Sequence, residues 1–194
     1  MQLLLQRIQN QDDQQSFEKF YQLFFFRLYQ FAYLYVHSKE SAEEVVNDVF
    51  LSLWQKRKTL DTINNINVYL YVAVKNASLN WLRKNRRVFT VSIDELRVDH
   101  LHLVPNPEIL LITREFQSLI LKAIEQLPPR CKIIFKLIKE DGLSYKEVAS
   151  ILDLSVKTVD SQLYHALKKL ALVLKPLESA NSALSSSTEN TQEK

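Results

Sequence analysis

Apolar residues recur at three- and four-residue intervals along most of this 194-residue chain, which is the period of a helix packed on one side. The clearest stretch is residues 144–170. Ser144 and Glu147 have the spacing of a capping box, and Ser155 has the position of a second N-cap eleven residues after Ser144. The first helix then has only about two turns before Asp153 turns the chain. A short helix, a tight turn and a longer helix together predict a helix-turn-helix.

The second helix of this motif has an apolar side and a polar side. The side that we expect to be buried consists of Val156, Val159, Leu163, Leu167 and Leu170. The opposite side carries side chains of the kind that bond phosphates and base edges: Lys157, Thr158, Ser161, Gln162, His165, Lys168 and Lys169. Because such a second helix usually enters the DNA major groove, we interpret this side as a DNA-reading face. The alternative is a plain helical hairpin with a solvated polar face.

Two helices are expected in the first third of the chain. Residues 17–36 are apolar and aromatic with scattered polar positions, which predicts a heavily buried helix. Ser41 and Glu44 form a second capping-box pattern, so the next helix should run from Ser41 to about Lys56. Its inward stripe consists of Val46, Val49, Phe50 and Leu53. Another stripe is acidic and aromatic, as in a protein-docking surface: Glu44, Asn47, Asp48, Leu51 and Trp54. The alternative for its acids is that they complement the helix dipole.

A third helix is predicted over residues 68–85, with Asn67 as its cap and Leu70, Val74, Ala77 and Trp81 on its inward stripe. Its polar positions, and the two residues that follow it, are mainly cations and amides: Lys75, Asn76, Asn80, Arg83, Lys84, Arg86 and Arg87. Cations interleaved with aromatic rings suit single-stranded nucleic acid, because bases stack on the rings and phosphates meet the charges. Dipole complementation and solubility are the alternative reading.

The rest of the chain sets the domain boundaries. Residues 88–107 show no sustained period and turn acidic, which indicates a linker, and two further helices are expected over residues 108–126 and 129–142. The tail after Pro176 is rich in Ser, Asn, Thr and Glu. We therefore expect an all-α chain of two small helical domains, residues 1–90 and 108–175, joined by a flexible linker at 91–107 and followed by a disordered tail at 176–194.

Composition narrows the class of protein. The chain has one glycine, Gly142, whereas sheet proteins need glycine in turns and bulges. One cysteine, Cys131, permits no internal disulfide, and neither a signal peptide nor a bilayer-length apolar run is present, so we expect a cytoplasmic protein. No catalytic constellation, metal-ligand spacing or phosphate-binding glycine loop occurs. We expect no enzyme activity, no metal, no cofactor and no small-molecule substrate.

Taken in order, these segments resemble a bacterial RNA polymerase sigma factor of the extracytoplasmic-function (ECF) type. SAEEVVNDVFLSLW at 41–54 is similar to the core-binding part of sigma region 2. NVYLYVAVKNASLNWLRKNRR at 67–87 is similar to the promoter-melting part of that region. LPPRC at 127–131, with GLSYKEVA at 142–149 and SVKTV at 155–159, is similar to region 4. Asp153 departs from the family, which usually has glycine at this turn position.

The resemblance implies a mechanism and partners. The acidic and aromatic stripe that begins at Glu44 would dock on core RNA polymerase. Asn64, Asn65 and Asn67 would join the basic residues that follow them in capturing the −10 element and helping to melt it. The polar side of the second helix of the helix-turn-helix would read the −35 element. Core polymerase, promoter DNA and an anti-sigma factor, membrane-bound in many family members, would be the partners.

Two other readings remain open on the residues alone. A free-standing helix-turn-helix regulator would bind DNA without polymerase and use residues 12–87 for sensing or dimerisation. A helical adaptor would have no DNA role. The basic run at 75–87 and the docking stripe on the helix that begins near Ser41 argue against both.

Overall fold

The computed structural model describes residues 1–85 and 114–189, with side chains described up to residue 85 and from 119 to 172. Every regular element in these ranges is helical, which confirms the predicted all-α class. In chain order the elements are α1 (Gln2–Gln11), α2 (Gln14–Val36), α3 (Lys39–Gln55), η1 (Arg57–Thr62), α4 (Ile66–Asn85), α5 (Arg114–Glu125), α6 (Pro129–Phe135), η4 (Lys136–Glu140), α7 (Tyr145–Leu152) and α8 (Val156–Glu189). The expected linker at 91–107 lies outside the described residues.

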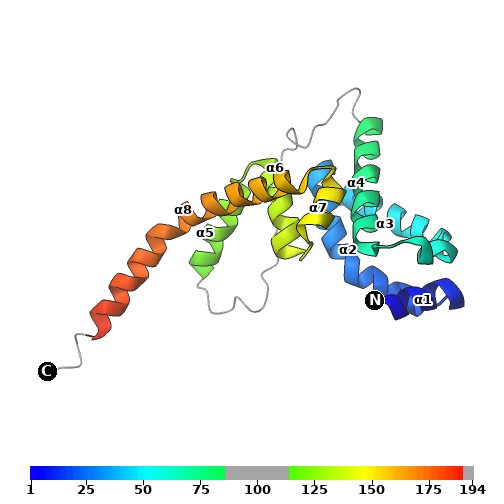
Figure 1. Cartoon of the computed structure of the whole chain (residues 1–194), viewed down its shortest axis with the longest axis horizontal. Coiled ribbons are helices and arrows are strands. Elements are labelled where there is room, and N and C mark those ends of the chain that lie inside the picture. Colours follow the sequence, from blue (N-terminus) through cyan, green and yellow to red (C-terminus); the bar gives the residue numbers. More distant parts are fainter. Residues whose placement is uncertain (86–113, 190–194) are drawn as a thin grey trace.

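The N-terminal half is a bundle in which α2 packs against both α3 and α4, while α1 lies along η1 (Figure 1). Aromatic side chains fill much of its interior. Phe20, Phe31 and Tyr35 are at most 1% exposed, and the Phe31 and Tyr71 rings meet edge to face with centroids 5.1 Å apart. Large rings give a small bundle much buried apolar area, and this half supplies most of one buried cluster that also includes residues of α6, η4, α7 and α8. Among the described helices, none is both long enough and apolar enough to cross a bilayer.

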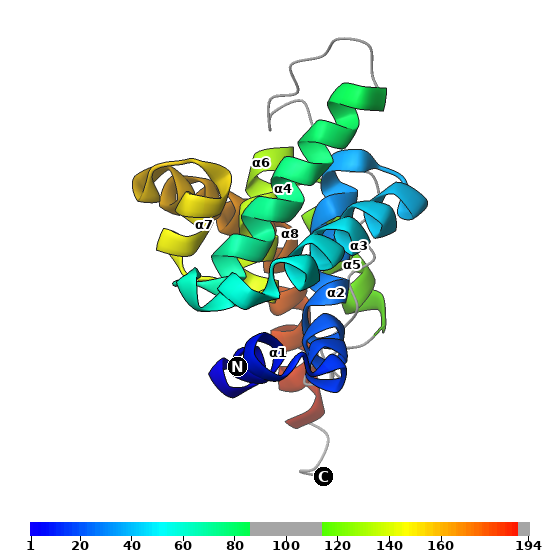
Figure 2. The same cartoon turned by 90° about the vertical axis from the view of Figure 1, so that its right-hand side faces the viewer.

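The C-terminal half contains the helix-turn-helix. Helix α8 packs on α5, α6 and α7, and its far end projects away from the rest of the molecule (Figure 1). Pro129 stands in the first turn of α6, where a missing N–H costs no hydrogen bond, and Gly142 follows η4 with a φ of 72°. The two halves touch, because α7 lies beside α4 (Figure 2).

Two helices begin earlier than predicted. His37 ends α2 in the left-handed conformation, so Ser38 is already extended and caps α3, with Ser41 N–H donating to Ser38 Oγ at 3.2 Å. Ser41 is therefore inside the helix. Likewise the α4 cap is Asn65, whose Oδ1 accepts from Val68 N–H at 3.1 Å, so the prediction of Asn67 was wrong. In both cases the N-cap is the residue at which the chain leaves the preceding segment, and this position depends on how that segment ends.

The buried side of α8 is narrower than the sequence predicts. Val156 is 45% exposed and Leu167 is 42% exposed, whereas Ala166 is fully buried. The inward stripe is Val159, Leu163, Ala166 and Leu170. An alanine on the packed side lets a helix lie close to its neighbours, and the two larger apolar residues are left at the edge of the contact. A similar shift occurs on α4, where Ala77 and Trp81 are half-buried while the buried positions include Tyr71, Ser78 and Leu82.

The tail also differs from expectation. Helix α8 continues to Glu189, so residues 176–189, which we expected to be disordered, are helical. This segment contains Leu177, Ala180, Ala183 and Leu184, which favour a helix, whereas Pro176 at its start removes one backbone hydrogen bond. Residues 190–194 lie outside the described range.

Candidate functional site

The turn of the helix-turn-helix is built from local hydrogen bonds. Ser144 Oγ accepts from Glu147 N–H at 3.3 Å while Ser144 N–H donates to Glu147 Oε2 at 2.8 Å, which confirms the predicted capping box. Asp153 ends α7 with φ 58° and ψ 50°, and Leu154 N–H then donates to the Ala149 carbonyl at 2.9 Å. Thr158 N–H donates to Ser155 Oγ at 3.0 Å, so Ser155 is the second cap as predicted. These bonds fix the direction in which α8 leaves the turn.

Most of the predicted reading face of α8 is available to a ligand. Lys157, Ser161, His165, Lys168 and Lys169 are all exposed. Side chains 157, 161, 165 and 168 follow one another at helical spacing, so they form a single polar ridge. Such a ridge of donors, held on a rigid helix with its opposite side buried, has the form of a base-reading element.

Two members of the predicted reading face have internal partners. Thr158 and Ser155 share a hydrogen bond between their hydroxyls at 2.7 Å. Gln162 is half-buried, and its Oε1 accepts from the Cys131 thiol at 3.0 Å. Burial raises the pKa of that thiol, which keeps it protonated and able to donate. A hollow beside the ridge is lined by Pro128, Cys131, Gln162, His165, Lys168, Lys169 and Leu172.

The predicted nucleic-acid contacts on α4 and just before it divide into two groups. Asn76, Asn80, Arg83 and Lys84 are exposed, and Arg83 Nη1 donates to Asn80 Oδ1 at 3.1 Å. Arg83 and Lys84 lie in the last turn of the helix, where cations also complement the dipole. Arg86 and Arg87 lie outside the described residues.

The second group consists of the asparagines around the start of α4 and of Lys75 in its middle, and two of its members contact the helix-turn-helix. Asn64 is exposed and Asn67 is half-buried. Asn65, besides capping α4, donates from Nδ2 to Glu147 Oε1 at 2.8 Å, and Lys75 Nζ donates to the Ile151 carbonyl at 2.7 Å. Burial lowers the pKa of the Lys75 ammonium, and the Asp153 carboxylate acts in the opposite direction. Sequence reasoning missed these contacts, because no local pattern signals a bond between residues 76 positions apart.

The predicted docking stripe on α3 is mostly a free surface. Glu44, Asn47 and Asp48 are exposed, and Leu51 is 55% exposed. An apolar residue so exposed among acids is typical of an interface core. Trp54 differs, because its ring lies 4.8 Å from the Phe17 ring and under the Arg57 guanidinium at 4.5 Å. Trp54 therefore also contributes to packing the end of α3.

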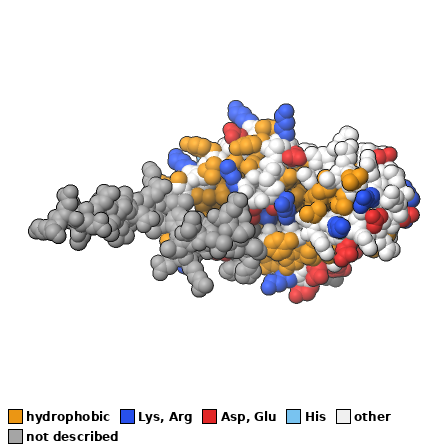
Figure 3. All heavy atoms as spheres, turned by 90° about the horizontal axis from the view of Figure 1, so that it is seen from below, with side chains coloured by type: hydrophobic (Ala, Val, Ile, Leu, Met, Phe, Trp, Pro, Cys, Tyr) orange, Lys and Arg blue, Asp and Glu red, His pale blue; other side chains and the backbone are white. Residues whose placement is uncertain are grey.

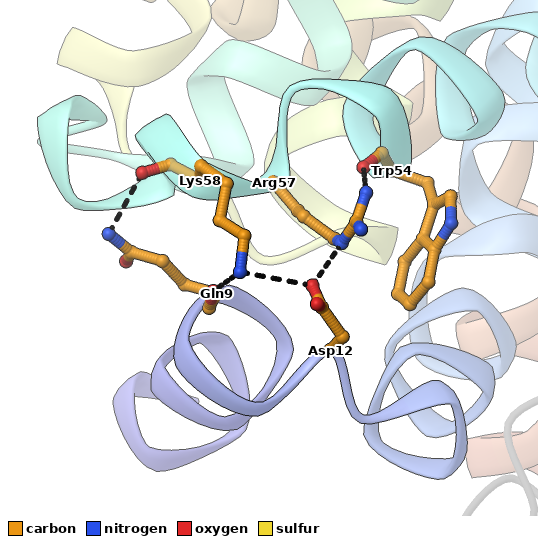
Figure 4. A network of polar contacts seen from close by, with 5 residues as sticks. All are labelled: Gln9, Asp12, Trp54, Arg57 and Lys58. Atoms are coloured by element: carbon orange, nitrogen blue, oxygen red, sulfur yellow. Dashed lines mark hydrogen bonds and ion pairs between the residues drawn. The ribbon is translucent and has the colours of Figure 1, made fainter.

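A polar network supports this end of α3 (Figure 4). Asp12 pairs with both Arg57 and Lys58, Gln9 Nε2 donates to the Lys58 carbonyl at 3.1 Å, and Arg57 Nη1 donates to the Trp54 carbonyl at 2.9 Å. The hydrogen bonds from Arg57 and Lys58 hold the pKa of the Asp12 carboxyl below its usual range. The ion pairs of Asp12 with Arg57 and Lys58 were not predicted from sequence, since the partners lie 45 and 46 positions apart.

The surface charge is mixed. On the face seen in Figure 3, cations and acids are interspersed with apolar patches, in keeping with a formal net charge of only +3. Long-range attraction to DNA from such a surface is modest. Within the described residues, no three metal-ligating side chains converge.

Comparison with known protein families matches two segments of the chain, one in each helical half. The family model of Sigma-70 region 2 matches residues 20–88, and that of Sigma-70, region 4 matches residues 117–170. The ECF RNA polymerase sigma-E factor of Escherichia coli is 26% identical over 183 residues, which are 91% of this chain and 95% of the relative. The RNA polymerase sigma-H factor of Pseudomonas aeruginosa is 23% identical over 91% of this chain and 94% of its own length.

Solved structures share the fold. CnrH in complex with the cytosolic domain of CnrY superimposes with a TM-score of 0.56 at 20% identity, over 90% of this chain and 96% of that one. The sigma factor RpoE in complex with the anti-sigma factor NepR from Bartonella quintana gives 0.55 at 21% identity, over 81% and 98%. With both sigma-70 regions matched in order on the two helical halves, the chain belongs to the RNA polymerase sigma factors of the ECF type.

Proposed function

We propose that this chain binds core RNA polymerase and directs it to promoters through two separate DNA grips. The observation that carries the proposal is that one chain presents three distinct surfaces: the reading ridge on α8, the basic end of α4 and the acidic, apolar stripe on α3. A free-standing regulator would need only the reading ridge on α8. We assign residues 1–90 to region 2, 91–107 to the linker and 108–175 to region 4.

The α8 ridge would read the −35 element. Lys157, Ser161 and His165 project from the exposed side of a helix whose other side is packed, so they can enter the major groove without rearrangement. Lys168 and Lys169 lie about one turn beyond His165, where they suit phosphate contacts that set the register. Gln162 and Thr158 would form the edge of this face.

The α4 surface would capture the −10 element as a single strand. Extruding a base costs a few kcal/mol in lost stacking and pairing, on the order of what a pocket and several phosphate contacts can offset. Asn64, Asn65 and Asn67 lie at the start of the helix, Lys75, Asn76 and Asn80 along it, and Arg83 and Lys84 at its end. Arg86 and Arg87 would continue the phosphate contacts.

The α3 stripe would dock on core polymerase through Glu44, Asn47, Asp48 and Leu51, with Trp54 holding the end of the helix in place. Tethering both DNA-binding halves to one polymerase raises the effective concentration of each, so neither needs high affinity alone. This fits the mixed charge of the surface. The chain would act in the cytoplasm, where polymerase transcribes, as a recognition subunit without catalytic activity of its own.

An anti-sigma factor is the further partner that we propose. One structural neighbour was solved with the anti-sigma factor NepR and another with the cytosolic domain of CnrY. A chain with the same arrangement of two helical halves offers the same kind of surface to such a partner. Binding of the anti-sigma factor would control when the sigma factor is available to core polymerase.

Run-off transcription with purified core polymerase and genomic DNA fragments tests the proposal. We expect defined start sites that require both the chain and core polymerase. If the chain neither binds core polymerase nor directs any start site, the proposed function is wrong.

A further inference from the structure

One residue of the predicted reading face is held by a side chain from another helix. Gln162 of α8 accepts a hydrogen bond at Oε1 from the Cys131 thiol of α6, with 3.0 Å between the sulfur and the oxygen. Helix α6 packs along α8 (Figure 1), and Cys131 is only 4% exposed, in a buried cluster that includes Leu127, Ala166 and Leu170. Because close packing fixes the thiol, it can orient the amide of Gln162.

The chemistry of this contact determines which end of the amide faces α6. Burial raises the pKa of Cys131, so the sulfur keeps a proton that it can donate. The amide oxygen of Gln162 accepts such a proton, whereas the amide nitrogen is itself a donor and sulfur is a weak acceptor. The oxygen is therefore the end that is turned inward, and the nitrogen Nε2 is the end left for a ligand.

The free end of the amide borders open space beside the reading ridge. Gln162 lines the hollow on this side of α8 together with His165, Lys168 and Lys169, and none of the described residues that line it is acidic. Among the described residues, Gln162 Nε2 has no hydrogen-bond partner. Residues three and four apart lie one above the other on a helix, so positions 162, 165 and 169 share a face. DNA that meets the ridge therefore meets an unpaired NH2 donor at Gln162.

This orientation changes which base a glutamine can read. A glutamine that is free to turn reads adenine with both ends of its amide, because Oε1 accepts from N6 and Nε2 donates to N7. With Oε1 of Gln162 held by Cys131, only the donor is presented. In the major groove guanine O6 and thymine O4 are acceptors, whereas adenine N6 and cytosine N4 are donors. A lone NH2 donor therefore favours guanine or thymine over adenine or cytosine.

We propose that Cys131 is a positioning residue for promoter selectivity: its thiol holds Gln162 as a donor-only reader, which selects guanine or thymine at one position of the −35 element. This inference rests on the proposed function, because it takes this face of α8 to read that element. The simpler role of the contact is to satisfy a half-buried amide. In that role, removing the thiol would leave the base preference unchanged.

Infrared spectroscopy of the free, full-length chain tests the contact itself. The sequence has one cysteine, so the S–H stretching band belongs to Cys131 alone. Gln162→Leu removes the acceptor and keeps the thiol covered, and Gln15→Leu makes the same change at an exposed position of α2. We expect the band to move to higher wavenumber in Gln162→Leu and to stay in place in Gln15→Leu. An unmoved band in Gln162→Leu would overturn the proposal while leaving the sigma function intact.

Binding of the holoenzyme to a promoter mapped by run-off transcription, with each base tried at each −35 position, tests the selectivity. Gln162→Ala identifies the base that Gln162 reads, as the position where discrimination falls. There the wild type should favour guanine over adenine, or thymine over cytosine, by about fivefold, the usual net value of one hydrogen bond. A wild-type preference for adenine or cytosine at that position, or no loss of discrimination in Gln162→Ala, would overturn the proposal.

Cys131→Ala and Cys131→Ser show whether the thiol sets this preference, since the two variants differ in one hydroxyl donor. In Cys131→Ala the amide is free to turn, so the preference should be lost at that position and the ranking at the other positions should persist. Cys131→Ser should retain the preference, because a hydroxyl can donate to Oε1 as the thiol does. Selectivity in Cys131→Ala equal to that of wild type, or an equal loss in both variants, would contradict the proposal.

Two further readouts keep these outcomes separate. Thermal unfolding of both Cys131 variants should show that the fold persists, and if either variant unfolded, the infrared band and the wild-type base preference would still decide. Failure of run-off transcription would remove the proposed function and, with it, the assignment of Gln162 to the −35 element. The infrared band would then still show whether the thiol holds the amide.

Discussion

Lys75 Nζ and the carbonyl oxygen of Ile151 lie 2.7 Å apart and join the basic helix α4 to the first helix of the helix-turn-helix. The bond is direct evidence that the two DNA-binding halves meet in the described structure. It also assigns Lys75 a structural partner in addition to its proposed phosphate contact. Variants of the proposed contact residues must therefore be chosen with these bonds in mind, because Lys75 has a partner within the chain and an exposed residue such as Lys157 is available to a ligand.

Lys157→Ala should lose selectivity among −35 sequences. Lys157 is exposed on the reading ridge, and a side chain that contacts a base is worth about 1–3 kcal/mol of discrimination. The measurement is binding of the holoenzyme to a panel of promoters that differ only in the −35 element. Lys122→Ala, an exposed lysine on α5, is the control. If the variant ranked the panel as wild type does and lost affinity uniformly, Lys157 would be a phosphate contact.

Asp48→Lys should weaken binding to core polymerase and leave the fold intact. Asp48 is exposed on the α3 stripe, beside Leu51, so a reversed charge meets the partner without disturbing the core. We expect a loss on the order of tenfold or more, as for a charged residue in an interface. Titration of labelled core polymerase measures it. Asp61→Lys, on η1, makes the same change away from the stripe, and equal affinities for the two variants would remove Asp48 from the docking surface.

Much of this architecture was predictable because it depends on local signals. The capping box, the second N-cap and the periodicity of residues 144–170 identified the helix-turn-helix, and the side chains proposed to read DNA proved largely exposed. The N-cap at Ser38 was not predictable, because it depends on the left-handed turn at His37. The contact between Lys75 and Ile151 was not predictable either, since its two residues lie on separate helices and come together only through tertiary packing.

Glu147→Gln should destabilise the helix-turn-helix by about 0.3–1 kcal/mol, the usual value of a negative charge near a helix N-terminus, because glutamine can still accept the cap hydrogen bond. The hydrogen bond from Ser144 N–H is the main reason why the pKa of Glu147 is lowered, and Asn65 adds to it. A lowered carboxyl pKa stabilises the fold fully above the unfolded pKa of about 4.3, and this stabilisation is lost as pH falls through the folded value.

Urea unfolding between pH 7 and pH 3 measures the effect. The difference in free energy of unfolding between wild type and Glu147→Gln should shrink as the pH falls. Glu43→Gln, at an exposed position on α3, is the control and should unfold as wild type does at neutral pH. A Glu147→Gln difference that stayed constant down to pH 3 would show that the charge of Glu147 does not support the cap.

Two substitutions of Asp153 by small residues should change the stability of the fold in opposite directions. Its φ of 58° is tolerated by aspartate but favours glycine, so Asp153→Gly should be neutral or stabilising and Asp153→Ala should be destabilising. We expect the two variants to differ by about 1 kcal/mol in free energy of unfolding. Thermal or urea unfolding measures this. Equal stabilities would mean that the turn relaxes out of the left-handed conformation when the aspartate is removed.

Footprinting on a promoter mapped by run-off transcription, with and without core polymerase, tests the central claim most directly. The account predicts protection around both the −35 and −10 elements, together with permanganate-reactive thymines in the −10 region, only when the chain and core polymerase are both present. Protection of the same DNA by the chain alone, with no effect of core polymerase and no melted thymines, would contradict it.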